Sequence, residues 1–196
     1  GRAMLIVGLT GGIATGKTTA SQTLQAHGVP VVDLDHLARV VVEPGRPAHA
    51  RIVRAFGPSI LQPDGAIDRP ALGRIVFEDA AKRRALNKAV HSAIFWELFM
   101  RLATLFFQGC GACVVDAPLL FEAGLHRACA ATIVVTAEDG VQLGRLMKRD
   151  GLSEEDAAAR MRAQMPTAEK ARRATVVIDN NGAREAARAD LMSAWA

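Results

Sequence analysis

Five short runs of apolar residues, rich in valine and isoleucine, are distributed along the chain. They lie at residues 4–9, 29–32, 113–116, 132–135 and 175–178. None of them alternates with polar residues, which is typical of strands covered on both faces, and polar or helical segments separate them as parallel connections require. The pattern predicts an α/β fold with a five-stranded parallel sheet sandwiched by helices. In such sheets, ligands bind beyond the carboxyl ends of the strands.

Two segments between the predicted strands have helical patterns. Residues 80–108 carry apolar side chains at near-helical spacing, namely Leu86, Val90, Ile94, Leu98, Leu102 and Leu105. We expect a long buried helix with at most one break, in a lobe over the cleft at about residues 60–110. Ser153, followed by three acidic residues, predicts the start of another helix. That helix would belong to a lid at about residues 145–174, within a single domain spanning residues 1–196.

The composition narrows the choice of partners. Half of the 196 residues are apolar, which is enough for one full core, and the net charge of +4 suits phosphate-rich ligands. The chain has no tyrosine and an aromatic content of 5%, which argues against nucleic acid as a partner because stacking aromatics are few. His91, Glu97 and Arg101 interrupt the most apolar long segment and would be costly in a bilayer, so we expect no membrane partner.

The three cysteines favour a reducing compartment. Cys110, Cys113 and Cys129 are too few and too unevenly spaced for a disulfide framework. Cys110 and Cys113 form a C-x-x-C motif, but it leads into a predicted strand, whereas a redox pair would open a helix, so a structural role is favoured. The N-terminal residues do not resemble an export signal, and the cytoplasm is the expected location.

The strongest functional motif follows the first predicted strand. Residues 11–18 read GGIATGKT and match G-x-x-x-x-G-K-[ST], the phosphate-binding P-loop. In this motif, glycines turn backbone amides toward phosphate groups, the lysine neutralises the β- and γ-phosphate oxygens, and the Ser or Thr hydroxyl binds Mg²⁺. The loop predicts a nucleoside triphosphate and Mg²⁺, with Lys17 as a catalytic residue. The expected nucleotide contacts are Gly12, Ile13, Ala14, Thr15, Gly16, Lys17, Thr18 and Thr19.

Carboxylates follow the second and third predicted strands. Asp33 and Asp35 lie one residue apart where an acceptor hydroxyl would meet the γ-phosphate, and either can accept the hydroxyl proton. Asp35 has an alternative role as the N-cap of a helix over residues 37–42. Asp116 follows the third strand, where P-loop proteins often place a carboxylate near Mg²⁺. We expect Thr18, Asp33 and Asp116 to form the metal site.

Cations and amides mark the later part of the chain. Arginines cluster around the predicted lid, and guanidinium groups suit bidentate contacts with phosphate, although each of them is also compatible with a solvated helix position. They are Arg145, Arg149, Arg160, Arg162, Arg172 and Arg173. Asn180 follows the fifth predicted strand, where its amide either reads an adenine edge or belongs to a turn.

Five motifs occur in an order that resembles the dephospho-CoA kinase family. They are LTGGI at 9–13, DxDxxAR at 33–39, VEPG at 42–45, PLLFE at 118–122 and IDNNG at 178–182. The second and fourth are far more specific than the P-loop, and together the motifs extend over nearly the whole chain. The resemblance implies a P-loop kinase fold with a nucleotide-binding core, a helical CoA-binding substrate lobe and a lid.

The resemblance also implies roles for individual residues. It makes Asp35 the general base, Arg145 and Arg149 contacts to ATP, and His91 part of the acceptor pocket. We further expect Asn180 to contact the nucleotide, and the acceptor pocket to include Thr10, Asp33, Asp35, Leu119 and Glu122.

The chain departs from the family pattern in three places. Ala14 and Thr15 replace the usual Gly-Ser, Leu34 replaces alanine, and Ser92 replaces the proline that commonly follows His91. The first two changes are expected to preserve the chemistry, since neither removes a backbone amide or a carboxylate. Without the proline, a helix is expected to run through His91, and a histidine packed in the core is then the alternative to a substrate contact.

The implied reaction transfers a phosphoryl group from ATP, with Mg²⁺, to the 3'-hydroxyl of dephospho-CoA. Another small-metabolite or nucleoside kinase of the same fold remains open, because the P-loop does not select the acceptor. A P-loop ATPase or switch protein is the alternative from a different class, and it would need a glutamine or glutamate to orient water. ATP turnover without an acceptor would distinguish these classes. The sequence does not predict the oligomeric state.

Overall fold

The computed structural model describes residues 3–196, which form two compact units. The first unit contains the chain up to Val32 together with Leu105–Ala196, and the second is Asp33–Thr104. The second unit therefore begins well before the lobe expected at about residues 60–110 and ends close to its predicted end. A single domain that contains this lobe and a lid stays a prediction.

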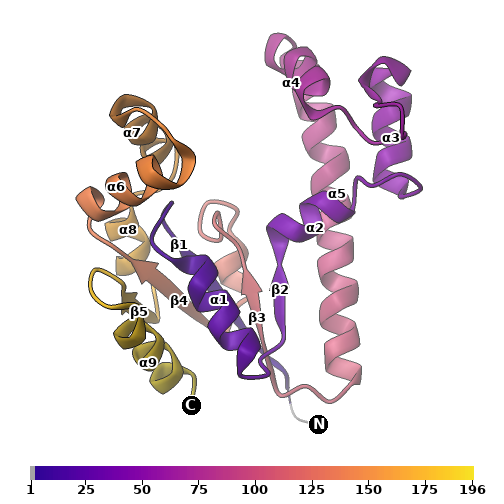
Figure 1. The fold of residues 1–196 in the computed structure, drawn as a ribbon. Helices are drawn as coiled ribbons and strands as arrows, with labels where there is room; N and C mark the ends of the chain where they lie inside the picture. The colour runs from indigo at the N-terminus through magenta and orange to yellow at the C-terminus, as the bar shows by residue number, and fades with distance from the viewer. Residues whose placement is uncertain (1–2) are drawn as a thin grey trace. The chain divides into compact units, whose positions relative to one another are not determined.

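A five-stranded sheet with the order β2-β3-β1-β4-β5 forms the centre of the first unit (Figure 1). The strands are β1 Leu5–Gly11, β2 Val31–Asp33, β3 Ala112–Asp116, β4 Ala131–Thr136 and β5 Val176–Asp179. Strand β1 pairs in parallel with β3 and β4, and β4 pairs in parallel with β5. All five predicted strands are confirmed. Because Leu9 lies opposite Asp116, the carboxyl ends of β1 and β3 meet at one edge of the sheet.

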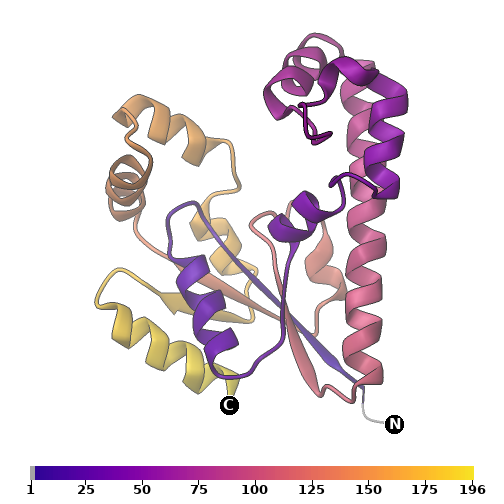
Figure 2. The same ribbon diagram turned by 45° about the vertical axis from the view of Figure 1, so that its right-hand side comes forward.

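Helices cover both faces of this sheet. Helices α1 (Lys17–Ala26) and α9 (Arg184–Trp195) lie together on one face, and α8 (Thr167–Arg172) packs against β4 on the other (Figures 1 and 2). The core on the first face contains the fully buried Leu9, Leu24 and Leu191. These contacts hold the connection between β1 and α1, which is the predicted phosphate-binding loop.

Helices α6 (Asp139–Asp150) and α7 (Glu154–Arg162) precede α8, and a short 3-10 helix, η2, spans Leu125–Ala128. The hydroxyl of Ser153 accepts a hydrogen bond from the amide of Asp156 at 3.1 Å, so the predicted N-cap of α7 is confirmed. The predicted lid segment thus contains three separate helices, because Gly151 ends α6 in a left-handed conformation and Pro166 precedes α8.

The second unit is helical. Its elements are α2 Leu34–Val40, α3 Pro47–Phe56, η1 Pro58–Ile60, α4 Arg69–Glu78 and the greater part of α5 Ala80–Phe107. Ile52, Ile60 and Leu72 form a small core, against which Leu86 and Val90 of α5 pack. Helix α5 continues without a break through His91, as the absence of a proline at Ser92 predicts.

The prediction that this long helix is buried is wrong. Leu98 is the buried residue of α5, whereas Phe95, Trp96 and Phe99 are exposed. The residues of α5 that pack against the small core of the second unit, among them Leu86 and Val90, come from the first half of the helix. The apolar spacing therefore identified a helix correctly, but it did not show how much of that helix other elements would cover.

Helix α5 is long and apolar enough to cross a membrane by length and composition alone. Its most apolar stretch has a mean hydropathy of 1.3, and no other helix among residues 3–196 meets the same criteria. A core helix of a water-soluble protein passes the same test, so this finding is weak evidence. Glu97, near the middle of the helix, pairs with Arg101 at 3.2 Å.

Candidate functional site

The P-loop connects β1 to α1 in a conformation that depends on glycine. Gly16 has a φ of 99° and is the N-cap of α1, in the left-handed region that favours glycine. A Cβ on Gly16 would collide with the Asn180 amide, and one on Gly12 would collide with Thr167 and Gln142. The loop backbone is thus enclosed by three side chains that come from later parts of the sequence.

Ala14 adopts a left-handed conformation as well. Its φ is 59°, and it is the one residue other than glycine with a positive φ among residues 3–196. The expectation that Ala14 preserves the chemistry of the loop rests on its backbone amide, which alanine keeps, and the left-handed conformation is an additional feature that the sequence did not show. An L-residue with a Cβ is strained in this region by about 1 kcal/mol, which a glycine avoids.

Lys17 and Asp116 form an ion pair at the edge of the sheet where β1 and β3 end. The Lys17 Nζ lies 2.6 Å from Oδ1 of Asp116, whose side chain is only 3% exposed. Thr18, the next residue, is exposed at the first turn of α1. The structure therefore gathers the predicted catalytic lysine and two of the three predicted metal ligands at the same edge of the sheet.

Asn180 and Arg145 form a chain of hydrogen bonds to the P-loop. The Asn180 side-chain amide donates to the Thr15 carbonyl at 2.7 Å, and Nη2 of Arg145 donates to the Asn180 carbonyl at 2.9 Å. Nη1 of Arg145 is buried and has no hydrogen-bond partner among the described residues. An unsatisfied buried guanidinium nitrogen next to a phosphate-binding loop suits an anionic or polar ligand group.

The other predicted nucleotide arginine lies in a different environment. Arg149 is largely exposed and donates two hydrogen bonds to Asp150, which also pairs with Arg160 at 3.0 Å. The hydrogen bond from Arg149 lowers the pKa of the Asp150 carboxyl, so this network is ionised at neutral pH. The structure does not bring Arg149 into the chain that joins Arg145 to the P-loop.

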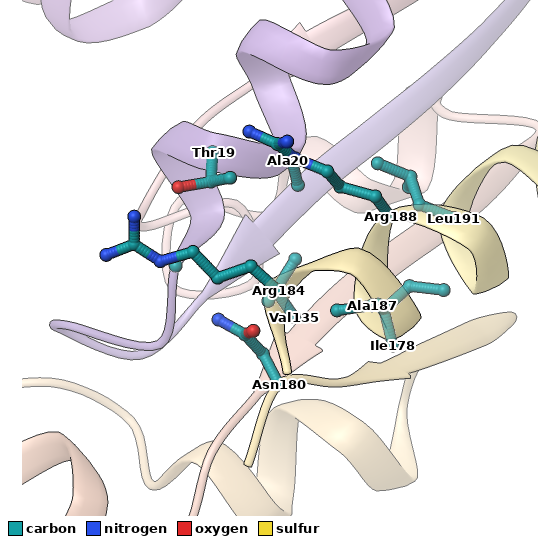
Figure 3. Close-up of a pocket in the computed structure, with 10 residues that line it drawn as sticks. Thr19, Ala20, Val135, Ile178, Asn180, Arg184, Ala187, Arg188 and Leu191 are labelled. Atoms are coloured by element: carbon teal, nitrogen blue, oxygen red, sulfur yellow. The ribbon is translucent and has the colours of Figure 1, made fainter. Parts of the chain in front are cut away.

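A pocket next to the P-loop lies between α1 and α9. Gly16, Thr19 and Asn180 border it, and Figure 3 shows Arg184 and Arg188 extending from α9 toward α1. The two arginines give this pocket positive charge. Sequence reasoning missed both of them, although Arg184 follows the NNG turn by only two residues.

In the second unit, Asp33 rather than Asp35 caps helix α2. Oδ1 of Asp33 accepts hydrogen bonds from the amides of Asp35 at 2.8 Å and His36 at 3.1 Å. The alternative that made Asp35 an N-cap is therefore wrong, since Asp35 lies inside the first turn and is exposed. His91 is exposed too, which excludes the histidine packed in a core.

The loop after β3 is held by Thr10 and Lys170. The Thr10 hydroxyl and the Lys170 ammonium both donate to the Pro118 carbonyl, at 3.0 Å and 2.6 Å. Lys170 also pairs with Oε1 of Glu122 at 3.0 Å, whereas Leu119 is 49% exposed. Desolvation raises the pKa of Glu122, but hydrogen bonds from its own amide and from Lys170 outweigh it, so the pKa lies below its ordinary value.

The C-x-x-C motif leads into β3, as expected for a structural role. Cys113 is a buried residue of β3, and the Cys110 thiol donates to the Ala112 carbonyl at 2.9 Å. Burial raises the pKa of the Cys113 thiol to about 11, so it stays protonated and unreactive at neutral pH. All three cysteines are free.

The oxygen donors at the edge of the sheet fit Mg²⁺. Thr18 supplies an exposed hydroxyl and Asp116 a carboxylate, and Mg²⁺ is usually held by one or two carboxylates together with substrate phosphates. Between residues 3 and 196, no group of three or more His, Cys, Asp or Glu side chains forms a metal site. The residues therefore suit a metal that arrives with the nucleotide.

Comparisons with known proteins cover both units. A family model described as dephospho-CoA kinase matches residues 5–185. The chain belongs to the dephospho-CoA kinase family. A dephospho-CoA kinase of Geobacillus kaustophilus is 48% identical over 96% of this chain and 94% of its own length. One from Arabidopsis thaliana is 50% identical over 91% of this chain and 77% of its own length.

Solved structures agree with this family and confirm the predicted P-loop kinase fold. Dephospho-CoA kinase from Campylobacter jejuni has a TM-score of 0.74 at 26% identity, covering 97% of this chain and 94% of its own. The TT1252 structure from Thermus thermophilus has a TM-score of 0.85 at 36% identity, covering 99% and 97% of the two chains. The family suggested by the five sequence motifs is thereby confirmed.

Proposed function

We propose that the protein phosphorylates dephospho-CoA at its 3'-hydroxyl with ATP, giving CoA and ADP. The observation that carries this proposal is the family match over residues 5–185, because it includes the helical second unit as well as the P-loop. The P-loop alone would not distinguish this family from other small-metabolite kinases or from P-loop ATPases. Neither alternative has a specific observation in its favour.

The nucleotide side of the reaction is assigned to the first unit. We assign the phosphates to the backbone amides of residues 12–19, and we assign to Lys17 the stabilisation of the charge that develops on the transferred group. The buried Nη1 of Arg145 donates a hydrogen bond to the nucleotide, while the Asn180 side chain holds the loop by donating to the Thr15 carbonyl. Arg149 also contacts a phosphate group of the nucleotide, and for this contact it must release Asp150, with which it pairs in the structure.

A bound Mg²⁺ would neutralise part of the phosphate charge. Thr18, Asp116 and Asp33 are the residues proposed to hold it. Oδ1 of Asp33 also caps α2.

The acceptor side is assigned to the second unit and to the loop after β3. Asp35, exposed in the first turn of α2, orients the 3'-hydroxyl and accepts its proton. His91, Leu119 and Glu122 are proposed to contact the rest of the acceptor, and Thr10 supports that loop from β1. We also propose that the protein is cytoplasmic and that it binds neither nucleic acid nor a membrane.

An acceptor panel tests this function. The protein would be mixed with Mg²⁺-ATP and dephospho-CoA, adenosine or other nucleosides, and the products identified by mass and by the position of the new phosphate. We expect product only at the 3'-oxygen of dephospho-CoA, with adenosine far slower because it lacks the remote contacts that hold the acceptor in line. Equal rates with adenosine would support a nucleoside kinase, and ATP hydrolysis without an acceptor would support the ATPase class.

A further inference from the structure

Lys170 is an unusual residue because its side chain is completely buried. Its exposed fraction is 0%, and lysine is almost never fully buried unless it is paired. From α8 the ammonium donates to the Pro118 carbonyl at 2.6 Å and pairs with the Glu122 carboxylate at 3.0 Å. One cation therefore holds the first and the last residue of the PLLFE segment, more than forty residues away in the sequence.

The same segment is also fixed by bonds that do not involve Lys170. Thr10 donates to the Pro118 carbonyl at 3.0 Å, and the Ala117 amide donates to the Leu9 carbonyl at 3.0 Å. The Met165 amide donates to Oε1 of Glu122 at 3.1 Å. Because Ala117 directly follows Asp116, the position of this segment is tied to the carboxylate that pairs with Lys17.

A buried ion pair is a poor way to increase stability. The free-energy cost of removing two charges from water offsets most of their attraction. Apolar residues of similar size often stabilise the folded protein as well or better. What this pair provides is a fixed position for the two ends of the segment, since the ammonium binds two oxygen atoms at defined distances at once. Between these two fixed ends, Leu119 remains 49% exposed.

We propose that Lys170 is a positioning residue for the acceptor, acting by holding the Pro118–Glu122 segment against α8. The proposal rests on the proposed function, because that segment is the part of the first unit assigned to dephospho-CoA. Thr167 of the same helix donates to Gln142, whose side chain borders Gly12 of the P-loop. Helix α8 thus contacts both the nucleotide loop and the acceptor segment, with Lys170 on the acceptor side.

Steady-state kinetics at varied concentrations of each substrate test the proposal. Lys170→Met keeps the length of the side chain but removes its charge, and we expect the KM for dephospho-CoA to rise at least about tenfold while the KM for ATP changes less than about twofold. Lys148→Met is the matched control, because Lys148 is an exposed lysine of the same unit, and it should change neither value. Equal changes in both KM values, or none, would overturn the proposal.

Lys170→Arg keeps a cation and donors at this position. We expect it to recover most of the loss, with a KM for dephospho-CoA raised about threefold and the KM for ATP unchanged. If Lys170→Met does not fold, this variant still decides the question, because a KM for dephospho-CoA equal to that of the parent would contradict a requirement for two precisely spaced bonds.

A double-mutant cycle with Glu122→Gln tests whether Lys170 acts through the segment. If it does, Lys170→Met should change the KM for dephospho-CoA less in the Glu122→Gln background than in the parent. Effects that multiply fully would instead mean that the two residues act independently, which the proposal excludes.

Amide hydrogen exchange separates this proposal from the proposed function. In the protein without substrates, Lys170→Met should speed exchange at residues 117–123 at least about tenfold, while exchange in β4 stays as in the parent. A parent enzyme that does not phosphorylate dephospho-CoA would overturn the proposed function and the assignment of this segment to that acceptor. Unchanged exchange in Lys170→Met, in a protein whose parent is an active kinase, would overturn the role of Lys170 alone.

Discussion

The polar residues of the nucleotide site and those of the helical unit are held very differently. In the first unit, Lys17 pairs with a buried carboxylate, and Asn180 and Arg145 are joined to the P-loop by hydrogen bonds. In the second unit, Asp35 and His91 are exposed, and Asp33 is held by the local cap of α2. The second half of α5 also contrasts with the core of the sheet, since its Phe95 and Trp96 are exposed while Leu9 and Leu24 are fully buried.

This contrast indicates what fixes the positions of the polar residues in each unit. A phosphate-binding loop made of backbone amides works only if other residues fix the backbone before the nucleotide arrives. A carboxylate that orients a hydroxyl can instead be positioned by the substrate that it contacts. Substitutions in the first unit should therefore change both stability and rate, whereas those at Asp35 should change the rate alone.

Lys17→Ala should have the largest effect. We expect turnover to fall at least about a thousandfold, because the main cation at the transferred phosphate is lost. Unlike a purely catalytic residue, Lys17 also pairs with the buried Asp116, so the free energy of unfolding should fall by about 1–3 kcal/mol. Turnover and thermal unfolding would both be measured.

Lys17→Ala combined with Asp116→Asn is the control for this prediction. It removes both charges of the pair, so much of the lost stability should return while turnover stays low. Activity within threefold of the parent in the single variant would contradict the role given to the P-loop lysine.

Asp35→Asn should lower turnover by about a hundredfold, with little change in unfolding temperature, because it removes the base from an exposed position and leaves the cap of α2 intact. Asp33→Asn is the matched variant, since asparagine also caps helices well. If Asp33 lies near the metal, its defect should be reduced by raising Mg²⁺, whereas the Asp35 defect should not. Equal recovery of the two variants would contradict this division of roles.

The sequence predicts most of the first unit because its signals are local. Unbroken apolar runs locate the five strands, and the spacing of glycines, lysine and threonine locates the P-loop. The contacts that hold this loop could not be predicted, since Asn180 and Thr15 are 165 residues apart and both belong to ordinary-looking segments. Lys170 was missed for the same reason, because one lysine in a charged helix resembles any solvated residue.

The second unit shows a different limit of the sequence. Apolar spacing predicts helix α5 almost to the residue, but it does not predict that Phe95, Trp96 and Phe99 are exposed. Periodicity reports local backbone geometry, while burial depends on which other elements reach that helix. The alternative that made Asp35 the N-cap of α2 was two residues too late, because Asp33 and Asp35 are equally good capping residues and only the backbone shows which one precedes the first turn.

Of the three substitutions Lys17→Ala, Asp35→Asn and Ala14→Gly, the last should have the smallest effect. It should raise the free energy of unfolding, whereas Lys17→Ala should lower it. Ala14 has a φ of 59°, where a Cβ costs about 1 kcal/mol and glycine has no such cost. Part of this gain is lost because glycine gives the unfolded chain more conformational freedom, by about 0.4–1 kcal/mol. The net increase in the free energy of unfolding should therefore be at most about 0.5 kcal/mol, or a rise of one or two degrees in the unfolding temperature.

Ala159→Gly is the control that shows whether this sign comes from the backbone conformation. Ala159 is an exposed residue in the interior of α7, where replacement by glycine should lower the free energy of unfolding by about 1 kcal/mol. Opposite signs at the two alanines would identify the left-handed conformation of Ala14 as the cause, because the chemical change is identical. A loss at Ala14 as large as that at Ala159 would show that the P-loop backbone is not strained there, and that this alanine is as compatible with the loop as the glycine it replaces.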